Sequence, residues 1–183
     1  RAGTGMKCFS LKGGIGSASR MMDFSFGNYT MGVLVLANYG VLEDFRLNGK
    51  LIGPSIKNEL DQETNDIENG SIMIIVATDL PVTSRQLKRI IARTSSGLAK
   101  TGSYYGNGSG DIAIGFSTAN RIPHNHKDLL SIQSIHDDHI DTAFAAVSEA
   151  TEEAILNALI TAEPTLERNG KTLHSLKEFT HLF

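Results

Sequence analysis

A serine at position 71 stands where the sequence changes character abruptly. The preceding residues 54–70 alternate acidic side chains with amides and isolated apolar residues, whereas residues 71–77 read Ser-Ile-Met-Ile-Ile-Val-Ala. The acidic stretch predicts a solvated linker, and the β-branched run predicts a buried central strand. Because glycine reaches backbone conformations closed to other residues, Asn69-Gly70 would let the Ser71 hydroxyl approach the Gly70 carbonyl.

Attack of the Ser71 hydroxyl on that carbonyl would transfer the acyl group from nitrogen to oxygen. Hydrolysis of the resulting ester would leave Ser71 as a new chain terminus with a free α-amine. Such an amine has a pKa of about 7.7 to 8.0, so it can accept the proton of the hydroxyl on its own residue near neutral pH. One residue would then serve as nucleophile and base without a histidine. On its position alone, a strand-edge serine with a structural role is the simpler interpretation.

The rest of the chain predicts the elements that must hold this serine. Apolar runs favour strands, glycine-rich stretches favour turns, and apolar residues at i, i+3 and i+4 favour helices. We expect strands at 6–11, 29–38, 47–52, 71–77 and 111–118, glycine-rich turns at 13–19 and 106–110, a helix from 83 or 84 to about 102, a long helix at 137–162, and a short amphipathic segment at 173–183. Strand pairs followed by helices indicate an α/β fold in which helices cover sheets.

Several sequence blocks, in a fixed order along most of the chain, resemble the L-aminopeptidase/D-esterase and β-aminopeptidase group of self-processing hydrolases. The blocks before the serine are Gly3-Thr-Gly-Met6, Lys12-Gly-Gly-Ile-Gly-Ser-Ala-Ser-Arg20 and Gly32-Val-Leu-Val-Leu-Ala-Asn-Tyr-Gly40. From the serine onward they are Gly70-Ser71-Ile72, Ile75-Val-Ala-Thr-Asp79, Gly97-Leu-Ala-Lys-Thr-Gly102, Asn107-Gly-Ser-Gly-Asp111 and Ala113-Ile-Gly-Phe-Ser-Thr118.

The resemblance implies roles for individual residues. It implies that Ser71 is the nucleophile, released at the start of a smaller subunit by self-cleavage between Gly70 and Ser71. Ser109 and Asp111 resemble the pair that supports this serine. Asn38 resembles the asparagine that donates a hydrogen bond to the oxyanion, where a fixed amide stabilises the charge of the transition state.

The same resemblance implies a four-layer α/β/β/α sandwich of the N-terminal-nucleophile type, of which this chain is a C-terminal portion. Residues 1–70 would end the larger subunit through the acidic linker 54–70, and residues 71–183 would form the smaller subunit. The implied partners are the missing N-terminal portion of the same precursor, a peptide or amino-acid amide substrate, and further copies in a homo-oligomer. Gly13 and Gly14 are weaker candidates for backbone N–H donors near the site.

Composition argues against several other classes of protein. The 183 residues, with 40% hydrophobic and 20% charged residues, fit one globular domain. A formal net charge of −3 offers no basic surface for nucleic acid or an anionic membrane. No apolar run approaches the length of about 20 residues that spans a bilayer. Cys8 alone cannot form an internal disulfide, which agrees with a cytoplasmic location but leaves a periplasmic or secreted one open.

Three further patterns suggest other chemistry, but each has a simpler interpretation. Two pairs of histidines have the spacing of metal ligands: His124 with His126, and His136 with His139. Loop histidines are commonly solvated, and acidic residues at a helix start favour the helix dipole. The stretch Gly14-Ile-Gly16 lacks the third glycine of a dinucleotide-binding loop, because Ser19 stands there. We therefore expect no metal and no organic cofactor.

These observations predict an aminopeptidase or amidohydrolase that releases N-terminal amino acids from peptides, amides or esters through an acyl-enzyme on Ser71. Two alternatives remain. One is acyl transfer, as in the ornithine acetyltransferases, where an amine rather than water takes the acyl group. The other is a non-catalytic remnant that binds a small molecule and never cleaves itself.

Overall fold

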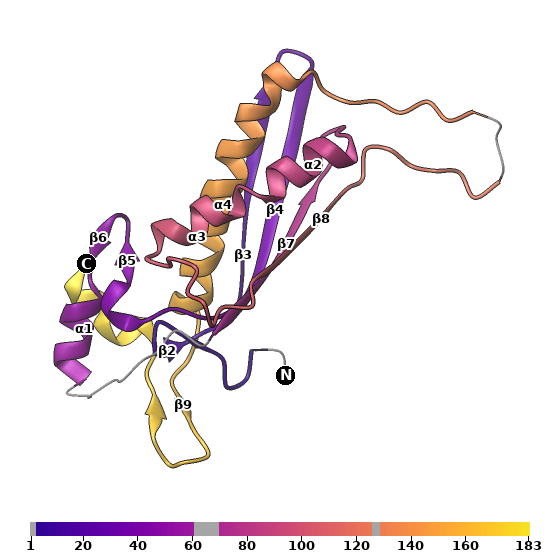
Figure 1. Cartoon of the computed structure of the whole chain (residues 1–183). Coiled ribbons are helices and arrows are strands. Elements are labelled where there is room, and N and C mark those ends of the chain that lie inside the picture. Colours follow the sequence, from indigo (N-terminus) through magenta and orange to yellow (C-terminus); the bar gives the residue numbers. More distant parts are fainter. Residues whose placement is uncertain (1–2, 61–69, 126–128) are drawn as a thin grey trace.

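The centre of the fold is a four-stranded mixed β-sheet. The computed structural model describes residues 3–60, 70–125 and 129–183 (Figure 1). The sheet has the order β3-β4-β7-β8, with β3 (Gly14–Phe24), β4 (Gly27–Asn38), β7 (Ser71–Thr78) and β8 (Ile112–Ser117). β4 is antiparallel to β3 and to β7, whereas β7 and β8 are parallel. The strands expected at 29–38, 71–77 and 111–118 are therefore confirmed, and β7 is central.

Helices cover one face of this sheet. The long helix α4 (Ile140–Ile160) packs along β3 and β4, α2 (Ser84–Ile91) lies beside β8, and α3 (Thr94–Lys100) packs against α4 (Figure 1). Gly16 allows α4 to approach β3 closely, because a Cβ at that position would lie 2.0 Å from the Ala154 carbonyl oxygen. The core of the protein lies between this helical layer and the sheet.

The other face of the sheet has no layer over it among the described residues, and we call it the open sheet face. Along β7, Ile72, Ile74 and Val76 are buried against the helices, whereas Met73 is 49% exposed on the opposite side. Exposed apolar side chains on the open sheet face come from all four strands: Ile15, Leu34, Met73, Ile112, Ile114 and Phe116. The described residues thus supply one sheet and one helical layer of the four layers expected.

The expectation of a turn at 13–19 is wrong. From Gly14 onward this stretch is the start of β3, paired with β4 along its whole length. Its glycines and small side chains have low strand propensity and therefore suggested a turn. The packing of α4 against Gly16 explains at least one of these glycines, since a strand glycine often marks a close approach of another backbone.

The continuous strand expected at 6–11 is also wrong. A tight hairpin of β1 (Lys7–Cys8) and β2 (Leu11–Lys12) stands there instead. Phe9 and Ser10 form its turn with φ angles of 50° and 58°. These left-handed conformations are uncommon for residues other than glycine, so the sequence gives no turn signal at this point.

The segment 54–70, expected as a solvated linker, begins as a helix. α1 (Gly53–Leu60) has Pro54 in its first turn, where a missing N–H leaves no helical hydrogen bond unmade. It buries Ile56 in the core. Residues 61–69 lie outside the described residues, so the linker stays a prediction there.

Local turn and cap signals are confirmed. The hairpin of β5 (Arg46–Leu47) and β6 (Lys50–Leu51) turns through Asn48 and Gly49, whose φ angles are 51° and 78°. Thr83 caps α2 and forms a capping box with Gln86. The helix expected to continue to about 102 is divided into α2 and α3.

The remaining elements are short. The structure adds 3₁₀ turns η1 (Leu42–Asp44), η2 (Asp137–His139) and η3 (Leu176–Leu182), and the hairpin strands β9 (Thr165–Leu166) and β10 (Thr172–Leu173). η2 leads directly into α4, which confirms the long helix, and η3 is the short segment expected near the C-terminal end. Within the described ranges, no helix is both long and apolar enough to cross a membrane.

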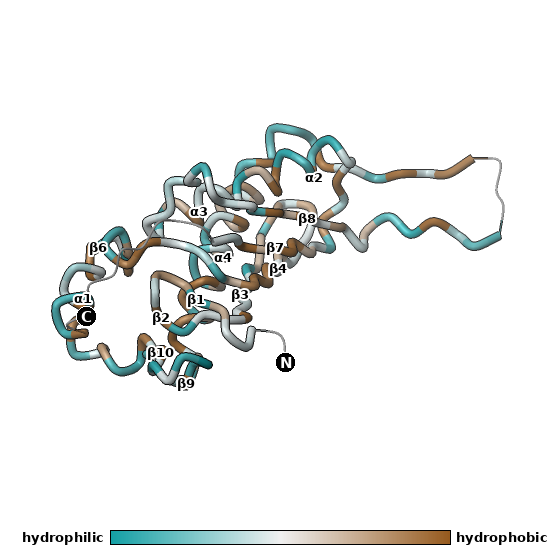
Figure 2. Tube along the Cα trace, turned by 60° about the horizontal axis from the view of Figure 1, so that its bottom comes forward, coloured by the Kyte–Doolittle hydropathy of each residue, from teal (hydrophilic) through white to brown (hydrophobic). Residues whose placement is uncertain are grey.

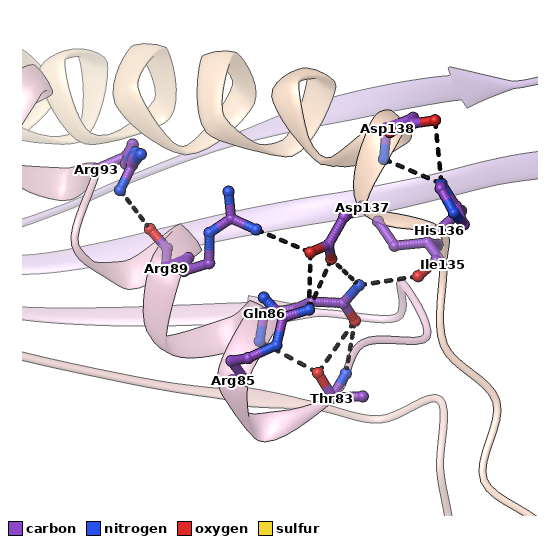
Figure 3. A network of polar contacts seen from close by, with 9 residues as sticks. All are labelled: Thr83, Arg85, Gln86, Arg89, Arg93, Ile135, His136, Asp137 and Asp138. Carbon is purple, nitrogen blue, oxygen red and sulfur yellow. Dashed lines mark hydrogen bonds and ion pairs between the residues drawn. The ribbon is translucent and has the colours of Figure 1, made fainter.

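Between β8 and η2 the chain leaves the body as a long projection, with apolar stretches on both of its limbs (Figures 1 and 2). Its returning limb is fastened to α2 by Asp137. The Asp137 carboxylate accepts hydrogen bonds from Arg85 and Gln86 at 2.7 to 2.9 Å and from Arg89 at 3.2 Å (Figure 3). Gln86 also donates to the carbonyl of Ile135 at 2.8 Å.

Replacing Asp137 with asparagine should make thermal unfolding less dependent on pH in the acid range. Hydrogen bonds from Gln86 and Arg85 hold the pKa of the Asp137 carboxyl below its ordinary value. The resulting stabilisation is present above the unfolded pKa of about 3.9 and is lost as the pH falls through the folded pKa. The measurement is the melting temperature as a function of pH for the wild type, Asp137→Asn and the control Asp23→Asn. Below about pH 5 the melting temperature of Asp137→Asn should therefore fall less steeply than that of the other two proteins. Parallel curves for all three proteins would contradict the assignment.

Candidate active site

Ser71 and Asn38 meet at one end of the sheet. They are the last register pair between β4 and β7, and directly opposite residues in antiparallel strands have Cβ atoms about 4.5 to 5.5 Å apart on one face. Because the neighbouring Ala37 and Ile72 are buried on the helix-covered side, Ser71 and Asn38 belong to the open sheet face. The structure therefore brings together the expected nucleophile and the expected oxyanion donor.

The loop before β8 returns to Ser71. Since β8 runs parallel to β7, the start of one strand lies beside the start of the other. The Gly110 N–H donates to Ser71 Oγ at 3.2 Å. A Cβ on Gly110 would lie 3.0 Å from the same oxygen, so glycine permits this approach. Sequence reasoning missed Gly110 as a site residue, although it lies between Ser109 and Asp111, which were both candidates.

Ser109 and Asp111 flank Gly110, whose N–H binds Ser71 Oγ, but no hydrogen bond joins their side chains in the described part of the chain. Asp111 Oδ1 accepts the N–H of Ile72 at 3.0 Å and so anchors the backbone immediately after Ser71. Ser109 Oγ is buried without a hydrogen-bond partner in the described part of the chain. Such an unpaired hydroxyl costs about 1 to 3 kcal/mol until a partner arrives.

Gly70 is required for a reason that the sequence did not indicate. Its φ lies outside the left-handed region, so it does not use a conformation reserved for glycine. Instead, a Cβ at this position would lie 2.2 Å from the Asn38 carbonyl oxygen and 2.6 Å from the Tyr39 Cα. The absence of a side chain therefore lets the chain enter β7 directly against the end of β4.

The side-chain amide of Asn38 has a defined orientation. Its Oδ1 accepts the backbone N–H of Lys7 at 3.0 Å. A backbone N–H can only donate, so the atom that faces it must be the amide oxygen rather than the nitrogen. Asn38 Nδ2 is thereby left as the group that can donate to a bound oxygen.

Comparison with known proteins decides the family. The model of peptidase family S58 matches residues 2–173. This chain belongs to peptidase family S58. The β-peptidyl aminopeptidase BapA of Sphingosinicella microcystinivorans is 36% identical over 187 residues, which cover 95% of this chain and 47% of that protein.

Solved structures of S58 relatives share the fold. The PH0078 protein of Pyrococcus horikoshii is 44% identical, with a TM-score of 0.86 over 98% of this chain and 49% of that one. The L-aminopeptidase D-Ala-esterase/amidase of Ochrobactrum anthropi, a prototype serine aminopeptidase, is 34% identical, with a TM-score of 0.85 over 99% of this chain and 52% of that one. The chain therefore has the mixed α/β, variant N-terminal-nucleophile hydrolase fold and spans about half the length of these relatives.

In this S58 chain, Gly13 and Gly14 lie where β2 leads into β3. The Gly13 N–H already donates to the Met6 carbonyl at 2.9 Å. Gly14 begins β3 and pairs with Ala37 of β4. Both glycines line a separate cavity of about 400 Å³ beside the C-terminal end of α4. The Gly13 N–H is therefore already engaged, and the role expected for Gly14 stays a prediction.

The other titratable residues considered are the histidines and Cys8. Within the described ranges, no group of three or more His, Cys, Asp or Glu side chains could hold a metal ion. His124, His136 and His139 are exposed, and His126 lies outside the described residues. Cys8 is fully buried, and burial raises the pKa of its thiol well above the usual range, which keeps it protonated and a poor nucleophile.

A methyl group at Gly110 should slow any reaction of Ser71. Gly110→Ala would keep the backbone N–H but place a Cβ 3.0 Å from Ser71 Oγ, which forces the loop or the hydroxyl to shift. We expect a loss in turnover of about 10- to 100-fold, the scale of a misplacement near 1 Å. Gly32→Ala is the matched control, since a Cβ there meets only the Ala77 oxygen at 3.7 Å. Equal activity of both variants would argue against a Gly110–Ser71 contact in turnover.

Proposed function

We propose that this chain is the reacting half of a self-processing aminopeptidase that releases N-terminal amino acids from peptides, amides or esters. Ser71 is the nucleophile in both self-cleavage and hydrolysis. The observation that carries this proposal is the convergence of three groups at the start of β7: Ser71 Oγ, the Gly110 N–H that binds it at 3.2 Å, and the directly opposite Asn38 amide. Membership of the S58 family supports the reaction class.

Self-cleavage would begin with attack of Ser71 Oγ on the Gly70 carbonyl carbon. The Ser71 nitrogen leaves as the ester forms, and water then hydrolyses that ester. The carboxylate of Gly70 departs with the preceding chain, and Ser71 keeps its hydroxyl and gains an α-amine. This amine takes the hydroxyl proton in the next attack and returns it to the leaving amine of the substrate.

The residues around Ser71 could hold it in place and assist its reaction once the chain has been cut. Cutting the chain before Ser71 frees its N-terminal end, and the bond from Ile72 to Asp111 would keep that end in place. The unpaired hydroxyl of Ser109 would find its partner in the new α-amine, which orients the amine toward Ser71 Oγ. Asn38 Nδ2 would donate to the substrate oxyanion.

The missing partner of this half would be the N-terminal portion of the same precursor. The exposed apolar residues on the open sheet face support this, because a second sheet could bury them and complete the four layers. Ser71 and Asn38 lie on that same face, so the N-terminal portion would also supply the remaining walls of the substrate pocket. Assembly into a homo-oligomer is part of the same proposal.

Intact mass spectrometry of the full-length protein tests the proposal. The wild type should give two fragments that meet between Gly70 and Ser71, whereas Ser71→Ala should give one uncut chain. The control Ser134→Ala changes an exposed serine and should be cut like the wild type. A single uncut chain in all three proteins would overturn the proposal and favour a non-catalytic binding protein.

Acyl transfer is the enzymatic alternative, since it would use the same acyl-enzyme. Adding a free amino acid such as ornithine to the cut protein with an amino-acid ester separates the two reactions. Hydrolysis releases the free acid at a rate independent of the added amine. A condensed amide as the main product would replace hydrolase with transferase as the conclusion.

A further inference from the structure

Lys12 carries a buried charge that the chemistry above does not use. The residue is only 8% exposed, although lysine seldom lies inside a protein unless its charge is paired. Its Nζ donates to the carbonyl oxygen of Gly3 at 2.8 Å and to that of Gly13. The ammonium group therefore ties two backbone segments together in place of an acidic partner.

Both segments are also hydrogen-bonded to Met6, the residue before Lys7. The Gly3 carbonyl also accepts the N–H of Met6 at 3.2 Å, and the Met6 carbonyl accepts the N–H of Gly13 at 2.9 Å. The hydrogen bonds among Gly3, Met6, Lys12 and Gly13 thus form a closed ring. Because this ring holds the backbone at Met6, it also holds the next N–H along the chain, that of Lys7.

The hairpin of β1 and β2 is attached to the end of β4 at two successive residues. The Lys7 N–H donates to Asn38 Oδ1 at 3.0 Å, and the Phe9 N–H donates to the Tyr39 carbonyl at 2.8 Å. Only the first of these bonds reaches a side chain. It alone decides which atom of the Asn38 amide faces away from the hairpin.

We propose that Lys12 is a positioning residue for the oxyanion donor, and that it acts by holding the Lys7 N–H against Asn38 Oδ1. The inference rests on the oxyanion role of Asn38 in the proposed function. With Oδ1 fixed, the Asn38 amide presents Nδ2 to the substrate oxygen before the reaction begins. Lys12 itself pairs with Lys7 across the hairpin, and its ammonium group donates to Gly3 and Gly13 rather than to Asn38.

The ammonium group suits this role because it can donate to two carbonyls at once. A methionine side chain has a similar length but no donor, so it would remove the link between the Gly3 and Gly13 carbonyls and leave the Gly3 carbonyl only its bond from Met6. The turn at residues 3–6 would loosen, and the Lys7 N–H would no longer constrain Asn38. A rotated amide would bring Oδ1 toward the oxyanion, where it would repel the negative charge.

A double-mutant cycle in the full-length protein tests the inference. Lys12→Met should lower kcat about 10- to 100-fold with KM changed less than about threefold, the scale expected for a misplaced donor. In an Asn38→Ala background, Lys12→Met should lower kcat by less than about twofold, because the group that it positions is gone. Lys100→Met is the matched control at a surface ion pair with Glu152 and should leave kcat unchanged.

Equal losses from Lys12→Met in both backgrounds would overturn the positioning role and leave a structural one. Unchanged kcat would overturn it as well. If Lys12→Met does not fold, Lys7→Pro removes the N–H directly and enters the same cycle with the same expectations. The wild-type rate, measured alongside, shows separately whether the proposed function holds.

A crystal structure of Lys12→Met would show the orientation of the Asn38 amide directly, which is a test that does not depend on activity. The inference requires Asn38 Oδ1 to separate from the Lys7 nitrogen or the amide to rotate. An Asn38 amide that keeps its 3.0 Å bond to Lys7 in the variant would refute the inference, even if the protein had no aminopeptidase activity.

Discussion

A Ser71→Ala variant of the full-length protein should stay a single chain and lose hydrolysis down to the background rate. Both reactions need the same oxygen, and the uncut chain would also lack the α-amine that serves as base. Removal of a serine nucleophile costs about 10⁶-fold in kcat in a well-studied serine protease, and we expect a loss of that order. Release of p-nitroaniline from amino-acid p-nitroanilides measures it.

Two further variants separate loss of the nucleophile from damage to the fold. Ser71→Cys keeps a nucleophilic atom at the same position, so it should still cleave its chain after Gly70, at a different rate. Gly110→Ala keeps Ser71 and should cleave slowly rather than not at all. Cleavage or turnover by Ser71→Ala at more than about 1% of the wild-type rate would exclude Ser71 as the nucleophile.

The pairing of Ser71 with Asn38 shows what the sequence could and could not predict. Apolar runs located β4 and β7 closely, because continuous apolar residues are typical of a strand that is covered on both faces. Their antiparallel register is set by contacts between residues 33 to 47 positions apart, and no local pattern encodes it. The roles of the two residues came from the resemblance, and only the structure brings them face to face.

Glycines were the main source of error, since one residue type serves several purposes. The stretch 13–19 suggested a turn, but Gly16 is small so that α4 can approach β3. Gly70 suggested an unusual backbone angle, but it is small so that the chain can pass Asn38 and Tyr39. In both cases the requirement comes from a segment distant in the sequence, which local propensities do not describe.

The open sheet face marks the limit of sequence reasoning in a different way. The apolar run of β7 predicted a buried central strand, but the described residues cover only one of its faces, and Met73 is 49% exposed on the other. Under the proposed function, the N-terminal portion of the precursor would supply the layer that this pattern calls for. Gly110 and the Lys7 N–H were missed because their contributions come from the backbone, which carries no signal in side-chain type.

Replacing Asn38 with alanine should reduce kcat about 10²- to 10³-fold and leave KM nearly unchanged. The amide donates to an oxygen whose charge develops mainly in the transition state, so its loss raises the barrier more than it weakens binding. Steady-state kinetics on a chromogenic amino-acid amide distinguish the two effects. Self-cleavage should slow as well if Asn38 also serves the Gly70 carbonyl, and a time course of fragment formation would measure this.

Asn38→Asp tests this prediction more strictly, because aspartate keeps an oxygen that can accept the Lys7 N–H but has no N–H group to donate. If Nδ2 is the active group, Asn38→Asp should be at least as slow as Asn38→Ala, since its carboxylate would repel the oxyanion. Asn28→Ala, at the other end of β4, is the control and should retain wild-type kinetics. A rise in KM with unchanged kcat in Asn38→Ala would assign this residue to substrate binding instead.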